Sequence, residues 1–276
     1  MQTISRAVRP VITAALLGAA LLSAGCGSSA RLTHENLNGL LWMQTSGEYR
    51  AACLTAYRTA TTQMEKALAD PGWTAALEQS GDLSALAPAV ILDADETALD
   101  NSAYQSRLAK SSRGFAPDTW SAWCREELAT AVPGASDFCR AAVERGVTLL
   151  FVTNRDTQLA ESTLRNLGKA GFPNDPRRVQ VIGKTAESDK GPRRADLSRR
   201  YRILLLVGDQ LGDFVSVPNG ASSTDRAALA EQNAAMWGTR WIALPNCTYG
   251  DWERSLVDSK RSDEENLKAK FGRLRD

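Results

Sequence analysis

The stretch VILDADET, Val90–Thr97, decides the fold, because an apolar run ends there in two aspartates one residue apart, followed by a threonine. Such a run predicts a buried strand that delivers carboxylates to its C-terminal tip. Successive side chains of a strand point to opposite faces, so Asp93 and Asp95 share a face if the strand continues, and a turn after Asp93 lets them splay around one centre. That geometry suits one nucleophile and one proton shuttle beside a cation.

Two later apolar runs also end in polar side chains. Leu149–Arg155 carries the hydroxyl of Thr153, and Ile203–Asp213 carries the carboxylates of Asp209 and Asp213. Open α/β sheets bind ligands beyond the carboxyl ends of their strands, where groups from different strands converge. The three runs therefore predict one polar site at the carboxyl ends of a parallel sheet.

A lysine between these two runs completes the pattern. Lys190 stands where a helix can begin, because the preceding Asp189 can cap it. Lys184 is the alternative, and its setting, Gly183–Thr185, looks like the end of a phosphate-binding loop. Arg178 occupies the position that would need the leading glycine of such a loop, so hydrolysis of nucleoside triphosphates is rejected.

The order of the predicted elements indicates an α/β fold. Strands and helices alternate, which predicts a Rossmann-like parallel sheet flanked by helices. About fifty residues separate the first two strands, too many for a simple crossover. We therefore expect residues 102–142, rich in Trp and Phe, to form a small helical cap over the site. The predicted strands lie at 89–92, from about 147, and at 179–182, 203–207 and 240–243; the predicted helices lie at 37–69, at 157–169, after Lys190 and at the charged end, 258–276.

The chemistry of this site follows from charge. A phosphate monoester carries about two negative charges near neutral pH, so an anionic nucleophile approaches it only when a cation and positive donors neutralise both. Asp93, Asp209 and Asp213 can supply oxygen ligands for Mg²⁺. Lys190 can hold the phosphoryl group, and Thr153 can donate a hydrogen bond to it.

Asp93 and Asp95 then have separate roles. Asp93 attacks phosphorus in line and forms an aspartyl-phosphate, while Asp95 protonates the leaving alkoxide and later takes a proton from the hydrolytic water. A phosphotransferase, which passes the phosphoryl group to an acceptor alcohol, is the alternative within enzymes.

The wider sequence resembles the bacterial class C acid phosphatases, the lipoprotein e family of 5′-nucleotidases in the haloacid dehalogenase superfamily. The resemblance includes Leu41–Gln44, Ser46–Tyr49, Leu99–Ser102 and Tyr249–Glu253, and it runs from about Leu41 to beyond Trp252. It implies an acid phosphatase that acts on nucleoside monophosphates, nicotinamide mononucleotide or aryl phosphates.

The resemblance also assigns roles to residues. It implies a metal held by the side chains of Asp93 and Asp209 and by the backbone carbonyl of Asp95, with Asp213 bound directly or through water. It further implies a substrate site made by three side chains, namely Asn154, Trp120 and Tyr249. Without the family, filling of the cap is favoured over a substrate role as the explanation of Trp120.

Composition is consistent with one enzyme domain, 26–276. The 33 basic and 32 acidic residues nearly balance, so there is no basic field of the kind that binding of a nucleic acid polymer requires. The only histidine, His34, sits in a polar N-terminal segment, which excludes a phosphatase with a histidine nucleophile. The sequence leaves a homo-oligomer open.

Residues 1–25 are predicted to be a lipoprotein signal peptide. Arg6 and Arg9 precede an apolar run, 11–22, which is followed by small residues and Cys26. The segment 22–26 resembles a lipobox, which implies lipidation of Cys26 and an outer-membrane lipoprotein. An ordinary cleaved secretory peptide, giving a periplasmic or secreted protein, is the second interpretation, and the run falls short of the roughly 18 residues of a transmembrane anchor.

Four cysteines follow Cys26: Cys53, Cys124, Cys139 and Cys247. In an exported protein they permit two disulfides in three connectivities, and a pair between Cys124 and Cys139 is favoured because both lie between the first two motifs.

A protein of another functional class is the alternative to an enzyme, namely a surface lipoprotein that binds a ligand or partner without turnover. It predicts that substitution of Asp93 leaves the function intact.

Overall fold

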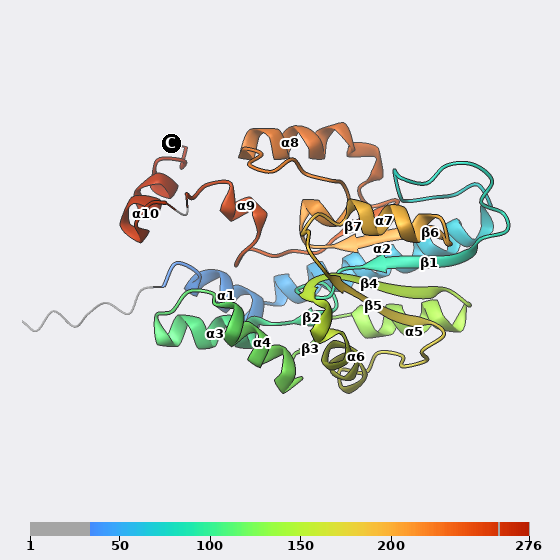
Figure 1. Ribbon diagram of the computed structural model, residues 1–276, viewed down its shortest axis with the longest axis horizontal. Helices are drawn as coiled ribbons and strands as arrows, with labels where there is room; N and C mark the ends of the chain where they lie inside the picture. Colours follow the sequence, from blue (N-terminus) through green and yellow to red (C-terminus); the bar gives the residue numbers. More distant parts are fainter. Residues whose placement is uncertain (1–33, 259, 276) are drawn as a thin grey trace, which may run out of the picture. The chain divides into compact units, whose positions relative to one another are not determined.

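The computed structural model describes residues 34–258 and 260–275, and a five-stranded sheet lies at its centre (Figure 1). The strands stand in the order β5-β4-β1-β6-β7, and every neighbouring pair is parallel. The predicted Rossmann-like α/β fold is confirmed, and the strand that carries VILDADET is the central one. The strands are β1 (Ala87–Leu92), β4 (Thr148–Asp156), β5 (Val179–Lys184), β6 (Tyr201–Gly208) and β7 (Trp241–Ala243).

Side chains of β1 point alternately into two apolar cores. Val90 and Leu92 belong to the larger core, and Ala89 and Ile91 belong to the smaller one. Because both faces of the strand are buried, the run contains no polar residue before Asp93. Several helices contribute residues to the larger core, and α7 contributes Leu197 to the smaller. Those of the larger core include α2 (Gly47–Ala69), α5 (Ala135–Glu144) and α6 (Ala160–Lys169), and α7 spans Gly191–Ser198.

The predicted helical region 37–69 forms two helices. After α1 (Leu37–Thr45), the hydroxyl of Ser46 accepts a hydrogen bond from the backbone N–H of Tyr49 at 3.0 Å and so begins α2. Further along α2, the buried Tyr57 hydroxyl donates to the carbonyl oxygen of Thr97 at 2.7 Å. Helix α2 thereby anchors the loop that follows β1.

The segment between β1 and β4 begins with an antiparallel pair, β2 (Leu99–Asp100) and β3 (Thr130–Ala131). Between these two strands lie α3 (Ser102–Ser111) and α4 (Pro117–Glu126). Helix α5, which the predicted cap segment 102–142 includes in large part, packs against α2 and β4. That the segment acts as a cap stays a prediction.

The C-terminal third adds helices around β7. Part of the charged end, 258–276, forms a helix as predicted, and Figure 1 shows it as α10. Within the described residues, no helix has both the length and the apolar character needed to cross a bilayer. The predicted signal peptide, 1–25, and Cys26 lie outside the described residues. The remaining helices are η1 (Thr157–Leu159), η2 (Leu211–Asp213), α8 (Ser223–Gln232), η3 (Ala234–Met236), α9 (Asp251–Arg254) and α10 (Asp263–Phe271).

The predicted disulfide between Cys124 and Cys139 is wrong for this structure, in which both cysteines are free thiols. Cys124 lies on α4 near Arg155, whereas Cys139 lies on α5 near Tyr57 of α2, so they pack in different surroundings. Both are buried, and burial raises the pKa of the Cys124 thiol to about 12. These thiols therefore act as small apolar packing groups.

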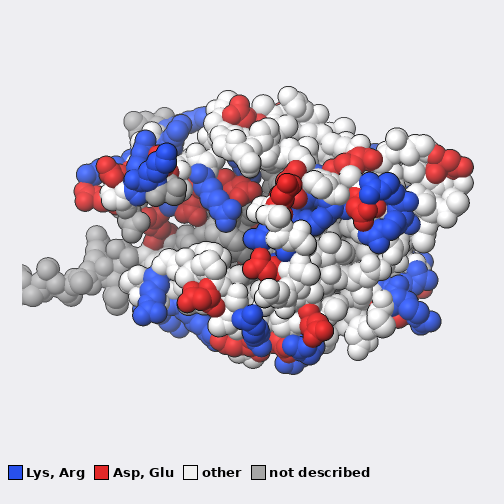
Figure 2. Space-filling model, in the orientation of Figure 1, with Lys and Arg blue, Asp and Glu red and all other residues white. Residues whose placement is uncertain are grey.

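Charged side chains of both signs mix on the surface. Figure 2 shows lysines and arginines interspersed with aspartates and glutamates over the visible face, without a region of a single sign. This distribution agrees with the nearly balanced composition and gives that face no stripe that would follow a nucleic acid backbone.

Candidate active site

Four charged side chains meet at the carboxyl end of the sheet. Asp93 directly follows β1, Asp209 directly follows β6, and Asp213 ends the short helix η2 just beyond it. Lys190 stands immediately before α7. One carboxylate oxygen from each of the three aspartates lies within 4.8 Å of the other two, a separation that suits shared coordination of one cation.

Lys190 neutralises part of this negative charge. Its ammonium donates hydrogen bonds to Asp93 and, at 2.6 Å, to Oδ1 of Asp213, and all three side chains are buried. Burial disfavours the charge on Lys190, but the two carboxylates outweigh burial and raise the pKa of the ammonium. Burial also raises the pKa of Asp93 well above its usual range, and Lys190 opposes that shift only in part. The cluster is therefore short of positive charge.

Three donors orient Asp209. Its Oδ2 accepts hydrogen bonds from the side-chain amides of Gln210 and Asn246, both at 2.8 Å, and its Oδ1 accepts one from the Thr97 hydroxyl at 3.1 Å. Burial and the neighbouring charge of Asp213 still raise the pKa of Asp209 to about 6. A divalent cation would relieve the cost of ionising it.

Gly208 permits the close approach of Asp213 to the end of β6. A Cβ atom at this position would lie 2.3 Å from Oδ2 of Asp213, nearer than two such atoms come in proteins. The same Oδ2 accepts hydrogen bonds from the backbone N–H groups of Asp209 and Gln210, at 3.1 and 2.8 Å. The glycine that ends the strand is therefore part of the architecture of the carboxylate cluster.

Asp95 lies beside the cluster and has different partners. Its Oδ1 accepts hydrogen bonds from Nη2 of Arg155 at 2.7 Å and from Nδ2 of Asn101 at 2.9 Å. Its Oδ2 lies 3.5 Å from the hydroxyl of Thr153. The site thus contains three carboxylates that can hold a cation and a fourth, separately held carboxylate that can exchange a proton.

Residues 28–252 match the family model described as HAD superfamily, subfamily IIIB (Acid phosphatase). The chain belongs to this acid phosphatase family. It is also similar to the class C acid phosphatase from Bacillus anthracis, with 33% identity over 89% of this chain and 98% of that one and a TM-score of 0.78. A second structure of a class C acid phosphatase from Bacillus anthracis, with tungstate bound, gives 32% identity over 87% of this chain and 97% of that one and a TM-score of 0.76.

These comparisons confirm the resemblance to class C acid phosphatases and make the chain a phosphoric monoester hydrolase. Phosphatases of this superfamily use a divalent metal, and the cluster of Asp93, Asp209 and Asp213 fits such an ion in ligand chemistry and spacing. Lys184, the alternative lysine of the sequence, pairs instead with Asp156 at 3.5 Å.

The three residues that the resemblance assigns to the substrate come from three different parts of the fold. Trp120 is half-buried on α4, and Tyr249 is half-buried in the loop after β7. The Tyr249 hydroxyl donates a hydrogen bond to the carboxylate of the buried Glu96. Asn154 is exposed, and its Oδ1 accepts a hydrogen bond from Nη2 of Arg193 at 2.7 Å.

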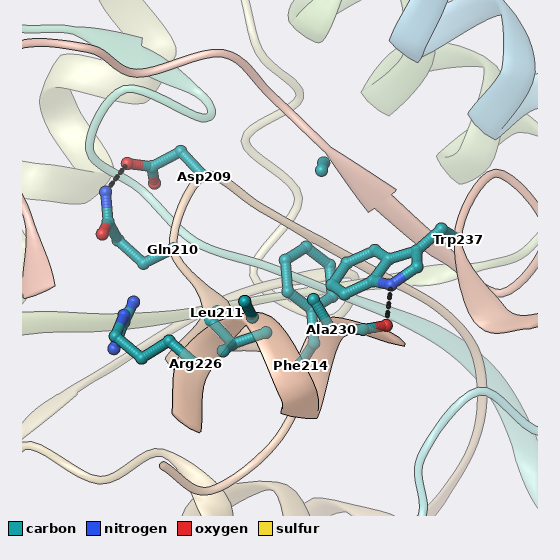
Figure 3. Close-up of a pocket in the computed structure, with 9 residues that line it drawn as sticks. Asp209, Gln210, Leu211, Phe214, Arg226, Ala230 and Trp237 are labelled. Atoms are coloured by element: carbon teal, nitrogen blue, oxygen red, sulfur yellow. Dashed lines mark hydrogen bonds between the residues drawn. The ribbon is translucent and has the colours of Figure 1, made fainter. Parts of the chain in front are cut away.

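A shallow pocket of about 380 Å³ is lined by Asp209, Gln210 and residues of η2 and α8, among others (Figure 3). Figure 3 shows Asp209 and Gln210 at one end of it and the rings of Phe214 and Trp237 at the other, 4.9 Å apart between centroids. Asp209 is the only one of the predicted site residues that lines it. Most of its lining is apolar, and Arg226 of α8 adds a basic side chain to it.

Sequence reasoning gave no role to several polar residues that hold the site together. The sequence indicates a place in the site most clearly for Arg155. Residues two apart on a strand share a face, and Arg155 follows Thr153 by two on β4. Asn246 follows β7 as the aspartates follow β1 and β6, so its place after a strand end was also readable. The residues that were missed are Asn101, Arg155, Gln210 and Asn246.

Metal binding should stabilise this acid phosphatase more at pH 7.5 than at pH 5. The pKa of Asp209 is about 6 in the metal-free fold, above the usual value, so between about pH 6 and pH 4 the native state holds a proton that the unfolded chain lacks. The metal-free protein therefore gains stability as pH falls through this window, and protons compete with the metal there.

Thermal unfolding with Mg²⁺ and with chelator at both pH values checks this. A metal concentration of 100 Kd at pH 7.5 adds about 2.7 kcal/mol, or roughly 5–10 °C in Tm for a domain of this size. At pH 5 the same metal concentration should give a smaller shift. Asp209→Asn should reduce the difference between the two pH values, and the carboxylate of Asp93, whose pKa is also raised, accounts for what remains. A shift that is larger at pH 5 than at pH 7.5 would contradict the expectation.

Proposed function

We propose that this acid phosphatase is a magnesium-dependent phosphomonoesterase that forms an aspartyl-phosphate on Asp93. The observation that carries the proposal is the buried cluster in which Asp93, Asp209 and Asp213 converge within 4.8 Å beside Lys190. Three carboxylates against one ammonium leave a net negative site, which repels a phosphate dianion unless a cation is added. The bound tungstate of the Bacillus anthracis relative is itself a tetrahedral oxyanion, which agrees with an oxyanion site in this fold.

The chain offers Mg²⁺ the side chains of Asp93 and Asp209, the backbone carbonyl of Asp95, and Asp213 directly or through water. All-oxygen ligands with few carboxylates are what Mg²⁺ prefers. When bound, the ion supplies positive charge that lowers the repulsion between nucleophile and substrate. Glycine at position 208 and the backbone N–H groups that bind Asp213 keep that carboxylate in place without a metal.

The residues of the chain then divide the reaction into two displacements. A carboxylate oxygen of Asp93 forms a bond to phosphorus as the ester P–O bond breaks, and the departing oxygen takes a proton from Asp95. Water next attacks phosphorus, giving its proton to Asp95, and releases phosphate and the free Asp93. Lys190 and the Thr153 hydroxyl hold phosphoryl oxygens throughout.

The substrates that we propose are nucleoside monophosphates, nicotinamide mononucleotide and aryl phosphates, all of which place a ring beside the phosphate. Trp120 and Tyr249 are both half-buried, so each has ring surface left for a ligand. Stacking on an aromatic side chain contributes about 1–3 kcal/mol per base. Asn154, exposed next to Thr153, is available to a substrate oxygen.

For the parts of the chain outside the described residues, we propose a signal peptide at 1–25, a lipidated Cys26 and anchorage in an outer membrane. The lipobox resemblance supports lipidation, and Gly27, which stands directly after Cys26 in place of an aspartate, resembles lipoproteins that are sorted to an outer membrane. Mass spectrometry of the mature N-terminal peptide tests it: an acylated peptide that begins at Cys26 is expected. An unmodified peptide beginning elsewhere would place the protein in the periplasm or outside the cell.

Phosphate release tests the proposed function directly. We expect release from nicotinamide mononucleotide, adenosine monophosphate and a chromogenic aryl phosphate with Mg²⁺, and its loss with chelator. Tyr249→Ala should raise KM for the nucleotides about tenfold or more, as loss of one stacking partner implies, and should change a non-aromatic phosphate ester little. No metal-dependent release from any substrate would overturn the proposal and favour a binding protein.

A further inference from the structure

Arg155 is a buried cation at the end of β4 to which the proposed mechanism gives no role. Its side chain is 1% exposed, its Nη1 donates to the Thr163 hydroxyl at 3.1 Å, and its Cζ lies 5.4 Å from the ring centroid of Trp120. A buried guanidinium is costly unless its charge and donors are satisfied. The partner that satisfies its charge is Asp95, the proton shuttle of the proposed mechanism.

The contacts of Arg155 make the two oxygens of Asp95 unequal. Oδ1 accepts hydrogen bonds from Nη2 and Nε of Arg155, at 2.7 and 3.0 Å, and from Asn101 at 2.9 Å. Oδ2 has only longer contacts, 3.2 Å to Nε of Arg155 and 3.5 Å to the hydroxyl of Thr153. With Oδ1 occupied by three donors, Oδ2 is the oxygen left for proton exchange, and it lies on the side of Thr153.

We propose that Arg155 is a positioning residue that fixes the Asp95 carboxylate with Oδ2 facing the leaving-group oxygen of the substrate. The inference rests on the proposed function, in which Asp95 gives its proton to that oxygen. A planar guanidinium suits the task, because Nε and Nη2 both reach the same carboxylate and restrict its rotation. Lysine, a single point charge on a flexible stem, would keep the charge and lose this restriction.

Arg155 also links Asp95 to the ring proposed to hold the leaving group. Its guanidinium pairs with the carboxylate of Asp95 and also lies over the ring of Trp120, in the range of a cation–π contact. One side chain thus contacts both the ring proposed to bind the leaving group and the acid proposed to protonate it. Loss of Arg155 should therefore affect substrates according to how much their leaving group needs a proton.

The test compares two leaving groups in Arg155→Lys. The 5′-alkoxide of adenosine monophosphate needs protonation as it departs, so kcat/KM for this substrate should fall about 100-fold, the scale of lost general acid catalysis. The 4-nitrophenolate of 4-nitrophenyl phosphate leaves without a proton, so its kcat/KM should fall no more than about threefold. A general loosening of the fold would lower both equally and would overturn the proposal.

A double-mutant comparison shows whether Arg155 acts through Asp95. In an Asp95→Asn background, Arg155→Lys should reduce hydrolysis of adenosine monophosphate no further, because the group that it positions no longer carries a proton. Independent, multiplying losses would contradict the inference. Arg165→Lys on α6, at an arginine bound to Glu127 on the surface, is the matched control and should leave both substrates unchanged.

Two further variants separate the possible failures. Thr163→Val removes one contact of the guanidinium and leaves Arg155 in place. It should lower kcat/KM for adenosine monophosphate about threefold to tenfold more than kcat/KM for 4-nitrophenyl phosphate. This variant tests the proposal even if Arg155→Lys does not fold. If Asp95→Asn itself spares adenosine monophosphate, the proposed function fails. If Asp95→Asn is selective and Thr163→Val and Arg155→Lys are not, only the role of Arg155 fails.

Discussion

Asp93→Asn should remove phosphate release from every substrate, with kcat falling by at least about 10⁴-fold. The carboxamide has nearly the shape of the carboxylate, but its oxygen is a poor nucleophile and forms no stable bond to phosphorus. Rapid-quench trapping should detect phosphoenzyme in the wild type and none in the variant. Substitution also removes one of three negative charges from the cluster, so the metal-free variant should unfold at a temperature no lower than that of the wild type at neutral pH.

Asp137→Asn is the matched control, because Asp137 is a largely exposed aspartate at the start of α5, bound only at the surface. It should keep wild-type activity. Residual turnover above about 1% in Asp93→Asn, with metal bound, would show that another group attacks phosphorus. The Tm of Asp93→Asn shows whether the variant is folded, so that a loss of activity can be assigned to the missing nucleophile rather than to unfolding.

Lys190→Met should lower kcat about 10³-fold while the metal still binds. The methionine keeps most of the volume of the lysine stem but removes the only ammonium that contacts Asp93 and Asp213 in the described part of the chain. The phosphoryl group then loses a charge-assisted contact in a buried site, where such contacts are strongest. Activity assays at saturating Mg²⁺ and thermal unfolding with and without Mg²⁺ measure the two effects.

In Lys190→Met, the carboxylates of Asp93 and Asp213 should bind Mg²⁺ at least as strongly as they do in the wild type. The metal would then be the main source of positive charge near Asp93, so the shift in Tm on adding Mg²⁺ should be at least as large as in the wild type. Lys184→Met is the control, because Lys184 is partly exposed and pairs with Asp156. Equal losses of activity in Lys190→Met and Lys184→Met would show that Lys190 has no special role in the active site.

The sequence predicted the sheet well because each strand of its interior is buried on both faces. β1 and β6 contain runs of aliphatic residues that give way to Asp93 and to Gly208 and Asp209, so the C-terminal ends of both strands are visible as changes of polarity. The convergence of Asp93, Asp209 and Lys190 followed from a general property of parallel sheets. No measured contact was needed for that inference.

The side-chain partners were beyond such reasoning, because they depend on packing between distant elements. Nothing in the sequence around Arg155 shows that its guanidinium reaches Asp95 rather than solvent, or that the Tyr249 hydroxyl meets Glu96. The cysteine pairing failed for the same reason, since spacing along the chain says little about which helices Cys124 and Cys139 join. These are facts of three-dimensional packing.

The order of strands in the sheet has a consequence for folding. The central strand, β1, is hydrogen-bonded to β4 and β6, both of which are made long after it, so its contacts are non-local. Asp93 acquires its charge partners only when β6 and the start of α7 have docked. A partly folded chain holds the nucleophile without the groups that let it approach a phosphate, so the appearance of enzyme activity during refolding should coincide with completion of the whole sheet.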